Sequence, residues 1–396
     1  MMTQGLGLSL LLLLTVAASF LLGWRFSQKR SNIFKQTFAH SYYRGMSYLL
    51  NEQMDNSVDK FIEALEVTGE TLEIHLALGN MMRRKGEAAK AIRIHQNVLD
   101  RRGLTSKQHH EAQLELARDY VSAGLLDRAE SLFQELIQLD SFYKSQALEQ
   151  LIEIYQDEKE WSKAIQAASM LSRLKGDKEP RELAVAKAHF CCELALQDIE
   201  NNNLEAAAQQ LQQAVSFDEN SVRASLILAE LAYRQGDYQT AVDALKKIPK
   251  QDPERINIAL PLLCDAYEKL ADSDGLQETL KEWLERYPTN QLVIKLADKI
   301  RATRDDYAAA DFIAEQLKRK PSIKALNRLV ELHLLHSEGE AKENLQLLKQ
   351  LVDKVMAEKP AYHCVKCGFS GAHLHWLCPG CKTWGSVKII KGVAGE

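Results

Sequence analysis

Four cysteines near the C-terminus have the spacing of a metal site. Cys364 and Cys367 form one Cys-x-x-Cys pair, and Cys378 and Cys381 form a second pair after a spacer of ten residues. Each pair can wrap a tight turn around one ion, and four thiolates complete a closed tetrahedral shell. The sequence therefore predicts that these four residues bind one metal ion, iron or zinc, because sulfur-only tetrahedral sites hold either metal.

The same pattern argues against an enzyme. Four sulfur ligands leave no open coordination position for a substrate or an activated water. His363, His373 and His375 lie near the cysteines, and with four thiolates available we expect them to be surface or supporting groups. The chain also has no GxxxxGK[ST] phosphate loop, no HExxH motif and no nucleophile elbow. We therefore expect no catalytic residues.

Residues 359–396 are predicted to form a small metal-binding domain. The Tyr-x-Cys-x-x-Cys-Gly and Cys-Pro-x-Cys elements resemble rubredoxin knuckles, which hold iron in that family, while the short spacer is closer to a minimal zinc ribbon. A domain of this size has too little core to fold alone, so the metal should contribute much of its folding free energy. We also expect it to pack against the last repeats of the helical array described next.

Helical repeats are expected to carry this domain, over residues 41–358. In the clearest copy, Ala229 and Ala241 let two helices approach closely, Gly236 makes the turn between them, and Pro253 stops the second helix. The small residue of each first helix recurs at intervals of 33 to 43 residues, at Gly45, Gly79, Ala117, Ile152, Ala195, Ala229, Cys264, Ala297 and Val330. A period near 34 residues resembles the tetratricopeptide repeat. The sequence predicts an all-α superhelical solenoid of about nine repeats, with a hinge at 172–182, where the longest interval falls.

An uncharged N-terminal stretch predicts a transmembrane anchor over residues 1–24. Its apolar part, 6–24, would span about 28 Å as a helix. A signal peptide carries positive charge before its apolar stretch, and here no charged residue precedes that stretch. A basic juxtamembrane segment follows over 25–40, and the first acidic residue is Glu52. The positive-inside rule therefore places the rest of the chain in the cytoplasm.

Composition and charge indicate a helical protein and argue against nucleic-acid binding and a disulfide framework. With 8 Pro and 19 Gly in 396 residues, helix should dominate, and a formal charge of -4 with both signs interspersed does not support nucleic-acid binding. The odd count of 7 cysteines argues against a disulfide framework. Cys191, Cys192 and Cys264 lie in apolar helical segments, so we expect them to be small core residues.

The order of these parts resembles the lipopolysaccharide assembly protein B family of Gram-negative bacteria over the full length of the chain. The resemblance implies a single-pass inner-membrane adaptor that presents the lipid A pathway deacetylase LpxC to the membrane protease FtsH and so restrains lipopolysaccharide synthesis. It further implies coupling to an inner-membrane protein that senses lipopolysaccharide, with Cys364, Cys367, Cys378 and Cys381 as the metal ligands. Whether the chain forms a homodimer is left open.

Two other functions are also left open by the residues alone. An iron-loaded knuckle could transfer electrons to a partner docked on the repeats, and zinc in the site would exclude that function. A zinc ribbon could instead bind nucleic acid through Lys366, Lys382, Lys388 and Lys391, although lysines on such a knuckle more often form a solvated face.

Overall fold

The computed structural model describes residues 71–176, 180–357 and 360–390. The predicted anchor, the basic segment and Gly45 of the first predicted repeat lie outside these residues. Within them, no helix combines the length and the apolar character that crossing a membrane requires. The chain divides into two compact units, Met1–Ile154 and Tyr155–Glu396.

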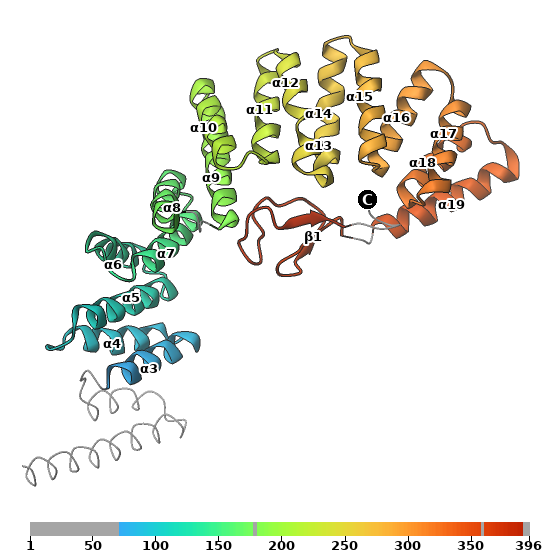
Figure 1. Ribbon diagram of the computed structural model, residues 1–396. Coiled ribbons are helices and arrows are strands. Elements are labelled where there is room, and N and C mark those ends of the chain that lie inside the picture. The colour runs from blue at the N-terminus through green and yellow to red at the C-terminus, as the bar shows by residue number, and fades with distance from the viewer. Residues whose placement is uncertain (1–70, 177–179, 358–359, 391–396) are drawn as a thin grey trace, which may run out of the picture. The chain divides into compact units, whose positions relative to one another are not determined.

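Helical hairpins make up most of the described chain (Figure 1). The first unit contains α3 (Leu72–Arg84), α4 (Ala88–Leu99), α5 (Ser106–Ser122), α6 (Leu126–Gln138) and most of α7 (Lys144–Asp157). The second unit continues with α8 (Trp161–Lys175), α9 (Arg181–Glu200), α10 (Leu204–Phe217), α11 (Val222–Arg234), α12 (Tyr238–Leu245), α13 (Ile248–Gln251), the 3-10 turn η2 (Pro253–Arg255), α14 (Ile256–Lys269), α15 (Ser273–Arg286), α16 (Asn290–Thr303), α17 (Asp306–Arg319), α18 (Ile323–Leu334) and α19 (Gly339–Ala357). In the first unit α3 to α6 pack in sequence order, and in the second unit α8 to α12 and α14 to α19 do the same, which confirms the predicted helical solenoid.

Small residues hold the two helices of each hairpin together, as the sequence period predicts. On the first helices, Ala117, Ala195 and Ala229 are completely buried. The facing position of the second helix is alanine in copy after copy, and each is completely buried: Ala91, Ala129, Ala164, Ala207, Ala241 and Ala309. An alanine at such a crossing lets the backbones approach, and larger neighbours fill the remaining space. Two copies with a larger residue at the first position, Ile152 and Cys264, bury it only partly.

The end of one repeat differs from the prediction. Helix α12 ends at Leu245, well before Pro253. The reason is Pro249, which has no N–H to donate to the Leu245 carbonyl and so prevents α12 from continuing. Pro253 instead begins η2 at the first helical position, where a missing N–H is tolerated. This turn places Arg255 at the start of α14, where it contacts the metal-binding domain.

The predicted hinge at 172–182 falls between α8 and α9, within the second unit, and residues 177–179 of it are not described. Lys187 Nζ on α9 donates a hydrogen bond of 2.9 Å to Ser172 Oγ on α8. The division between the two compact units lies elsewhere, between Ile154 and Tyr155. The hinge therefore stays a prediction.

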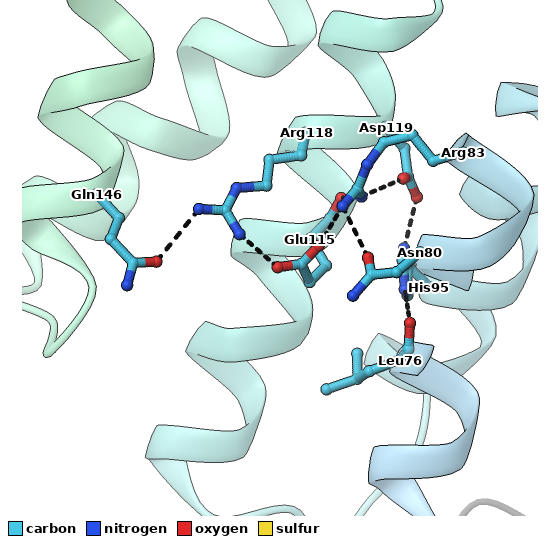
Figure 2. Close-up of polar contacts among 8 residues, drawn as sticks. All are labelled: Leu76, Asn80, Arg83, His95, Glu115, Arg118, Asp119 and Gln146. Atoms are coloured by element: carbon cyan, nitrogen blue, oxygen red, sulfur yellow. Dashed lines mark hydrogen bonds and ion pairs between the residues drawn. The ribbon is translucent and has the colours of Figure 1, made fainter. Parts of the chain in front are cut away.

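A buried polar network joins α3, α4 and α5 in the first unit (Figure 2). Arg83 donates hydrogen bonds to Glu115 Oε2 and to Asp119 Oδ1, both at 2.7 Å. His95 Nδ1 lies 2.5 Å from the other carboxylate oxygen of Asp119, and both side chains are fully buried. Because removing any member leaves a buried charge or polar group unsatisfied, the network holds the three helices in one register.

Gly79 provides the space for this network. A Cβ at this position would lie 2.3 Å from His95 Nε2. Replacing a helical glycine by alanine ordinarily stabilises a protein by roughly 1 kcal/mol, but here the methyl group would displace a buried ring. We expect Gly79→Ala to destabilise the first unit by about 1–3 kcal/mol, measured by thermal unfolding followed by circular dichroism. In a His95→Ala background the methyl group has room, so the same change should be neutral or stabilising; an equal loss in both backgrounds would contradict this explanation.

Candidate metal centre

The C-terminal segment folds into a three-stranded antiparallel sheet, which we call the knuckle module (residues 360–390). Its strands are β1 (Tyr362–Cys364), β2 (Ser370–Gly371) and β3 (Val387–Ile389), in the order β2-β1-β3. Cys364 pairs with Val387 across β1 and β3. The buried centre of the module consists of Cys364, Cys378 and Val387, so two of its three core residues are predicted metal ligands.

Two equivalent turns, one at each Cys-x-x-Cys pair, direct the cysteine side chains toward a common centre. The Cys364 carbonyl accepts a hydrogen bond of 3.0 Å from Gly368 N–H, and the Cys378 carbonyl accepts one of 2.9 Å from Lys382 N–H. The residue after the second cysteine of each pair has a positive φ, +78° at Gly368 and +50° at Lys382. Gly380 has a different role, because a Cβ there would lie 3.3 Å from Cys367 Sγ.

The four sulfur atoms converge on one point. All four Sγ atoms lie within 4.8 Å of one another, and the group contains no histidine. The Sγ atoms of Cys364 and Cys381 are 3.7 Å apart, and those of Cys367 and Cys378 are 3.6 Å apart. A tetrahedral ion with metal–sulfur bonds of about 2.3 Å separates its ligands by about 3.8 Å. The four cysteines are therefore positioned to bind one metal ion.

The pKa values of these thiols also favour the binding of a cation among them. Burial alone would raise the pKa of Cys364, but its hydrogen bond with Ser386 Oγ at 3.3 Å and the backbone N–H groups of Cys367 and Lys366 lower that pKa to about 6. A backbone N–H at Phe369 stabilises the Cys367 thiolate, yet crowding by the other sulfurs raises the pKa of Cys367 to about 11. Four sulfurs this close cannot all ionise without a positive ion among them, so the donor set fits a thiolate-bound metal.

Two tryptophans attach the knuckle module to the helices. The Trp384 ring stacks on His189 of α9, with centroids 4.7 Å apart and planes at 15°, and its Nε1 donates a hydrogen bond of 2.7 Å to Gln156 Oε1. The guanidinium of Arg223, on α11, lies 5.6 Å from the Trp384 ring and 5.8 Å from the Trp376 ring. Such cation–π contacts are strongest where water is excluded, as here.

Arg255 is the most deeply placed polar contact of this interface. The residue is only 4% exposed, and its Nη2 donates a hydrogen bond of 2.6 Å to the Val387 carbonyl of β3. The guanidinium also lies 5.0 Å from the Trp376 ring and 3.6 Å from Asp252. Burial lowers the pKa of Arg255, and the charge of Asp252 offsets part of that effect.

Two of the four lysines considered for nucleic-acid binding contact acidic residues of the helical array. Lys382 Nζ lies 2.5 Å from Asp157, and Lys388 Nζ lies 2.6 Å from Asp252. Lys391 is outside the described residues. Lys382 and Lys388 therefore contribute to the attachment of the knuckle module, whereas Lys366 donates a hydrogen bond of 2.9 Å to Thr383 within the module.

The position of the knuckle module corrects the expectation that it packs against the last repeats. Its contacts are with the end of α7, with α9 and α11, and with η2, in the middle of the array. The reason is α19, which is about 28 Å long for its 19 residues and leads the chain back toward the module (Figure 1). No motif in the sequence marks Gln156, His189, Arg223 or Arg255 as contacts of the module. A usable signal was present in Trp376 and Trp384, because a domain this small cannot bury two tryptophans by itself.

His189 makes the attachment sensitive to pH. Burial, followed by the nearby charges of Arg223 and Arg255, lowers the pKa of His189 to about 3. In the unfolded chain the pKa returns to about 6.5, so between these values the unfolded state binds more protons and stability falls as the pH falls. We expect a loss of about 1.4 kcal/mol between pH 7.5 and pH 5.5, measured by urea unfolding followed by tryptophan fluorescence. His189→Phe keeps a stacked ring without a titrating group and should remove that part of the pH dependence; an unchanged pH dependence would contradict the assignment to His189.

The repeats and the four-sulfur site define a class: tetratricopeptide-repeat proteins that carry a rubredoxin-type metal-binding domain. The tetratricopeptide repeat family matches residues 192–256, and the rubredoxin metal binding domain family matches residues 362–388. Lipopolysaccharide assembly protein B of Escherichia coli K12 is 37% identical over 391 residues, which cover 98% of this chain and 99% of the relative. The protein of the same name from Haemophilus influenzae is 33% identical, with 96% and 98% covered. The chain belongs to the lipopolysaccharide assembly protein B family.

Among solved structures, a tetratricopeptide repeat protein from Parabacteroides merdae matches 72% of this chain and 100% of its own, with 17% identity and a TM-score of 0.33.

Proposed function

We propose that this protein is a non-enzymatic adaptor of lipopolysaccharide assembly that presents the deacetylase LpxC to the membrane protease FtsH. The observation that carries the proposal is the match to lipopolysaccharide assembly protein B over 98% of the chain. Tetratricopeptide arrays bind protein segments along extended surfaces, which suits a protein that brings two others together. An inner-membrane protein that senses lipopolysaccharide would be a third partner.

The proposal includes a topology that rests on the sequence. Residues 1–24 form a single anchor in the bacterial inner membrane, 25–40 a basic segment on its cytoplasmic side, 41–358 the repeats and 359–396 the metal-binding domain. The uncharged first 24 residues and the basic residues that follow them support this order.

In this proposal Cys364, Cys367, Cys378 and Cys381 are the ligands of one iron or zinc ion with a structural role. Two of the ligands are also core residues of the knuckle module, so the ion maintains the fold that presents Trp376 and Trp384 to the helices. A closed shell of four thiolates has no free position for a reaction at the metal.

The test is to measure both partners and their turnover. Full-length protein in membranes, with the four cysteines intact or all replaced by Ser, is crosslinked and captured, and the half-life of LpxC is followed in the same cells. We expect FtsH and LpxC to be recovered together, and the half-life of LpxC to be longer in cells that carry the Ser variant. If neither protein is captured and the half-life of LpxC is the same with and without the chain, the adaptor proposal is wrong.

A further inference from the structure

Two adjacent loops of the first unit expose apolar side chains beside basic ones. The loop between α6 and α7 exposes Phe142 by 79% and Leu139 by 54%. Lys107, in the first turn of α5, places its Nζ 5.0 Å from the centre of the Phe142 ring, so the start of α5, and with it the end of the preceding loop, lies near this loop. That loop also carries Arg101 and Arg102, both exposed. We call these five residues the basic aromatic patch.

The outward direction of Phe142 is built into the loop. The next residue, Tyr143, is buried, and so is Ser141 before it. Ser141 donates its N–H to the Leu136 carbonyl at 3.1 Å and accepts from the Lys144 N–H at 2.9 Å. The loop is therefore fixed through the neighbours of Phe142, and the exposed ring is not required for its fold.

The cations of the patch are Arg101, Arg102 and Lys107, and one exposed acidic residue, Asp100, directly precedes Arg101. Neither Arg101 nor Arg102 forms an ion pair with any residue in the part of the chain that the structure describes, and Lys107 contacts the ring rather than an acid. The nearest acidic group of the apolar loop, Asp140, pairs with Lys144 at 2.8 Å. The patch thus presents apolar side chains together with unneutralised cations.

We propose that the basic aromatic patch binds the surface of an anionic lipid bilayer. Large apolar side chains enter the boundary between head groups and acyl chains, while adjacent cations remain at the level of the anionic head groups. A protein partner of the same shape would need acidic groups around an apolar pocket, whereas an anionic bilayer supplies both features everywhere along its surface. This contact would be additional to the predicted anchor and does not depend on the adaptor role.

Photocrosslinking from the patch tests the proposal in the full-length chain. Phe142→p-benzoyl-phenylalanine is reconstituted into vesicles of phosphatidylcholine alone or with a third of phosphatidylglycerol, and lipid adducts are counted after irradiation. The matched control is Tyr307→p-benzoyl-phenylalanine, at an aromatic position that is 61% exposed in the second unit. We expect lipid adducts at position 142 to exceed those at 307 by about fivefold or more in the anionic vesicles.

The dependence of the adduct yield on the charge of the patch and of the lipid distinguishes binding by the patch from proximity to the membrane. Arg101→Ser with Arg102→Ser should lower the adduct yield at position 142 by about fivefold or more, without changing the helical circular dichroism. Equal yields at 142 and 307, or a yield that is the same in neutral and anionic vesicles, would overturn the proposal. In cells, an adduct at 142 to a protein in place of lipid would also overturn it and assign the patch to a protein partner.

Discussion

Replacing Cys364 and Cys367 by Ser is expected to abolish metal binding and unfold the knuckle module while the helices remain. The module has almost no core apart from its ligands, because Cys364 and Cys378 occupy two of its three fully buried positions. Structural zinc sites contribute about 10–16 kcal/mol of apparent binding free energy to small domains, far more than such a core could replace. The measurement is metal content by mass spectrometry together with far-ultraviolet circular dichroism.

A matched variant separates ligand loss from cysteine loss in general. Cys264→Ser changes a half-buried cysteine of α14, outside the four-sulfur group, and should retain one metal ion per chain. If the double ligand variant also lost a large part of its helical signal, the module and the helical array would not be separate folding units, and the proposed structural role of the metal would have to extend to the repeats.

Replacing Arg255 by Leu is expected to release the knuckle module from the helices without removing its metal. The change leaves the Val387 carbonyl without its buried donor, removes one of the two cations that contact Asp252, and removes the cation beside Trp376. Breaking a buried ionic contact by removing one member costs about 3–5 kcal/mol. Hydrogen exchange of residues 362–390 and metal content, measured on the same sample, test this expectation.

Lys382→Ala is the control for this interface. Its ion pair with Asp157 is solvent-exposed, with side chains 58% and 45% exposed, so its loss should cost about 0–1 kcal/mol. Equal hydrogen exchange in the Arg255 and Lys382 variants would show that the buried guanidinium does not hold the module in place. Loss of metal in Arg255→Leu would show that attachment and metal binding are one event.

The residues explain which parts of the structure could be predicted. The positions of Ala229 and Ala241 recur at a regular interval along the chain, because each repeat makes the same local contact between its two helices. This regularity is visible in a single sequence. The cysteine pairs are equally visible, since their ligand geometry is formed within a few residues. The attachment of the module was not predictable in the same way, because Trp384 and Gln156 are 228 residues apart. Nothing near Arg255 in the sequence distinguishes it from a helical surface residue.

The contact between Trp384 and Gln156 changes the mechanical character of the repeats that it encloses. In an open solenoid each repeat contacts only its neighbours, so either end can fray independently. Here the returning chain binds at α7, α9, α11 and η2, and therefore closes the stretch from α9 to α19 into a ring. Fraying of α18 or α19 does not by itself propagate past that closure. A pulling force applied at the C-terminus reaches the knuckle module first, so the contacts of that module with α9, α11 and η2 bear the load before the enclosed repeats can extend.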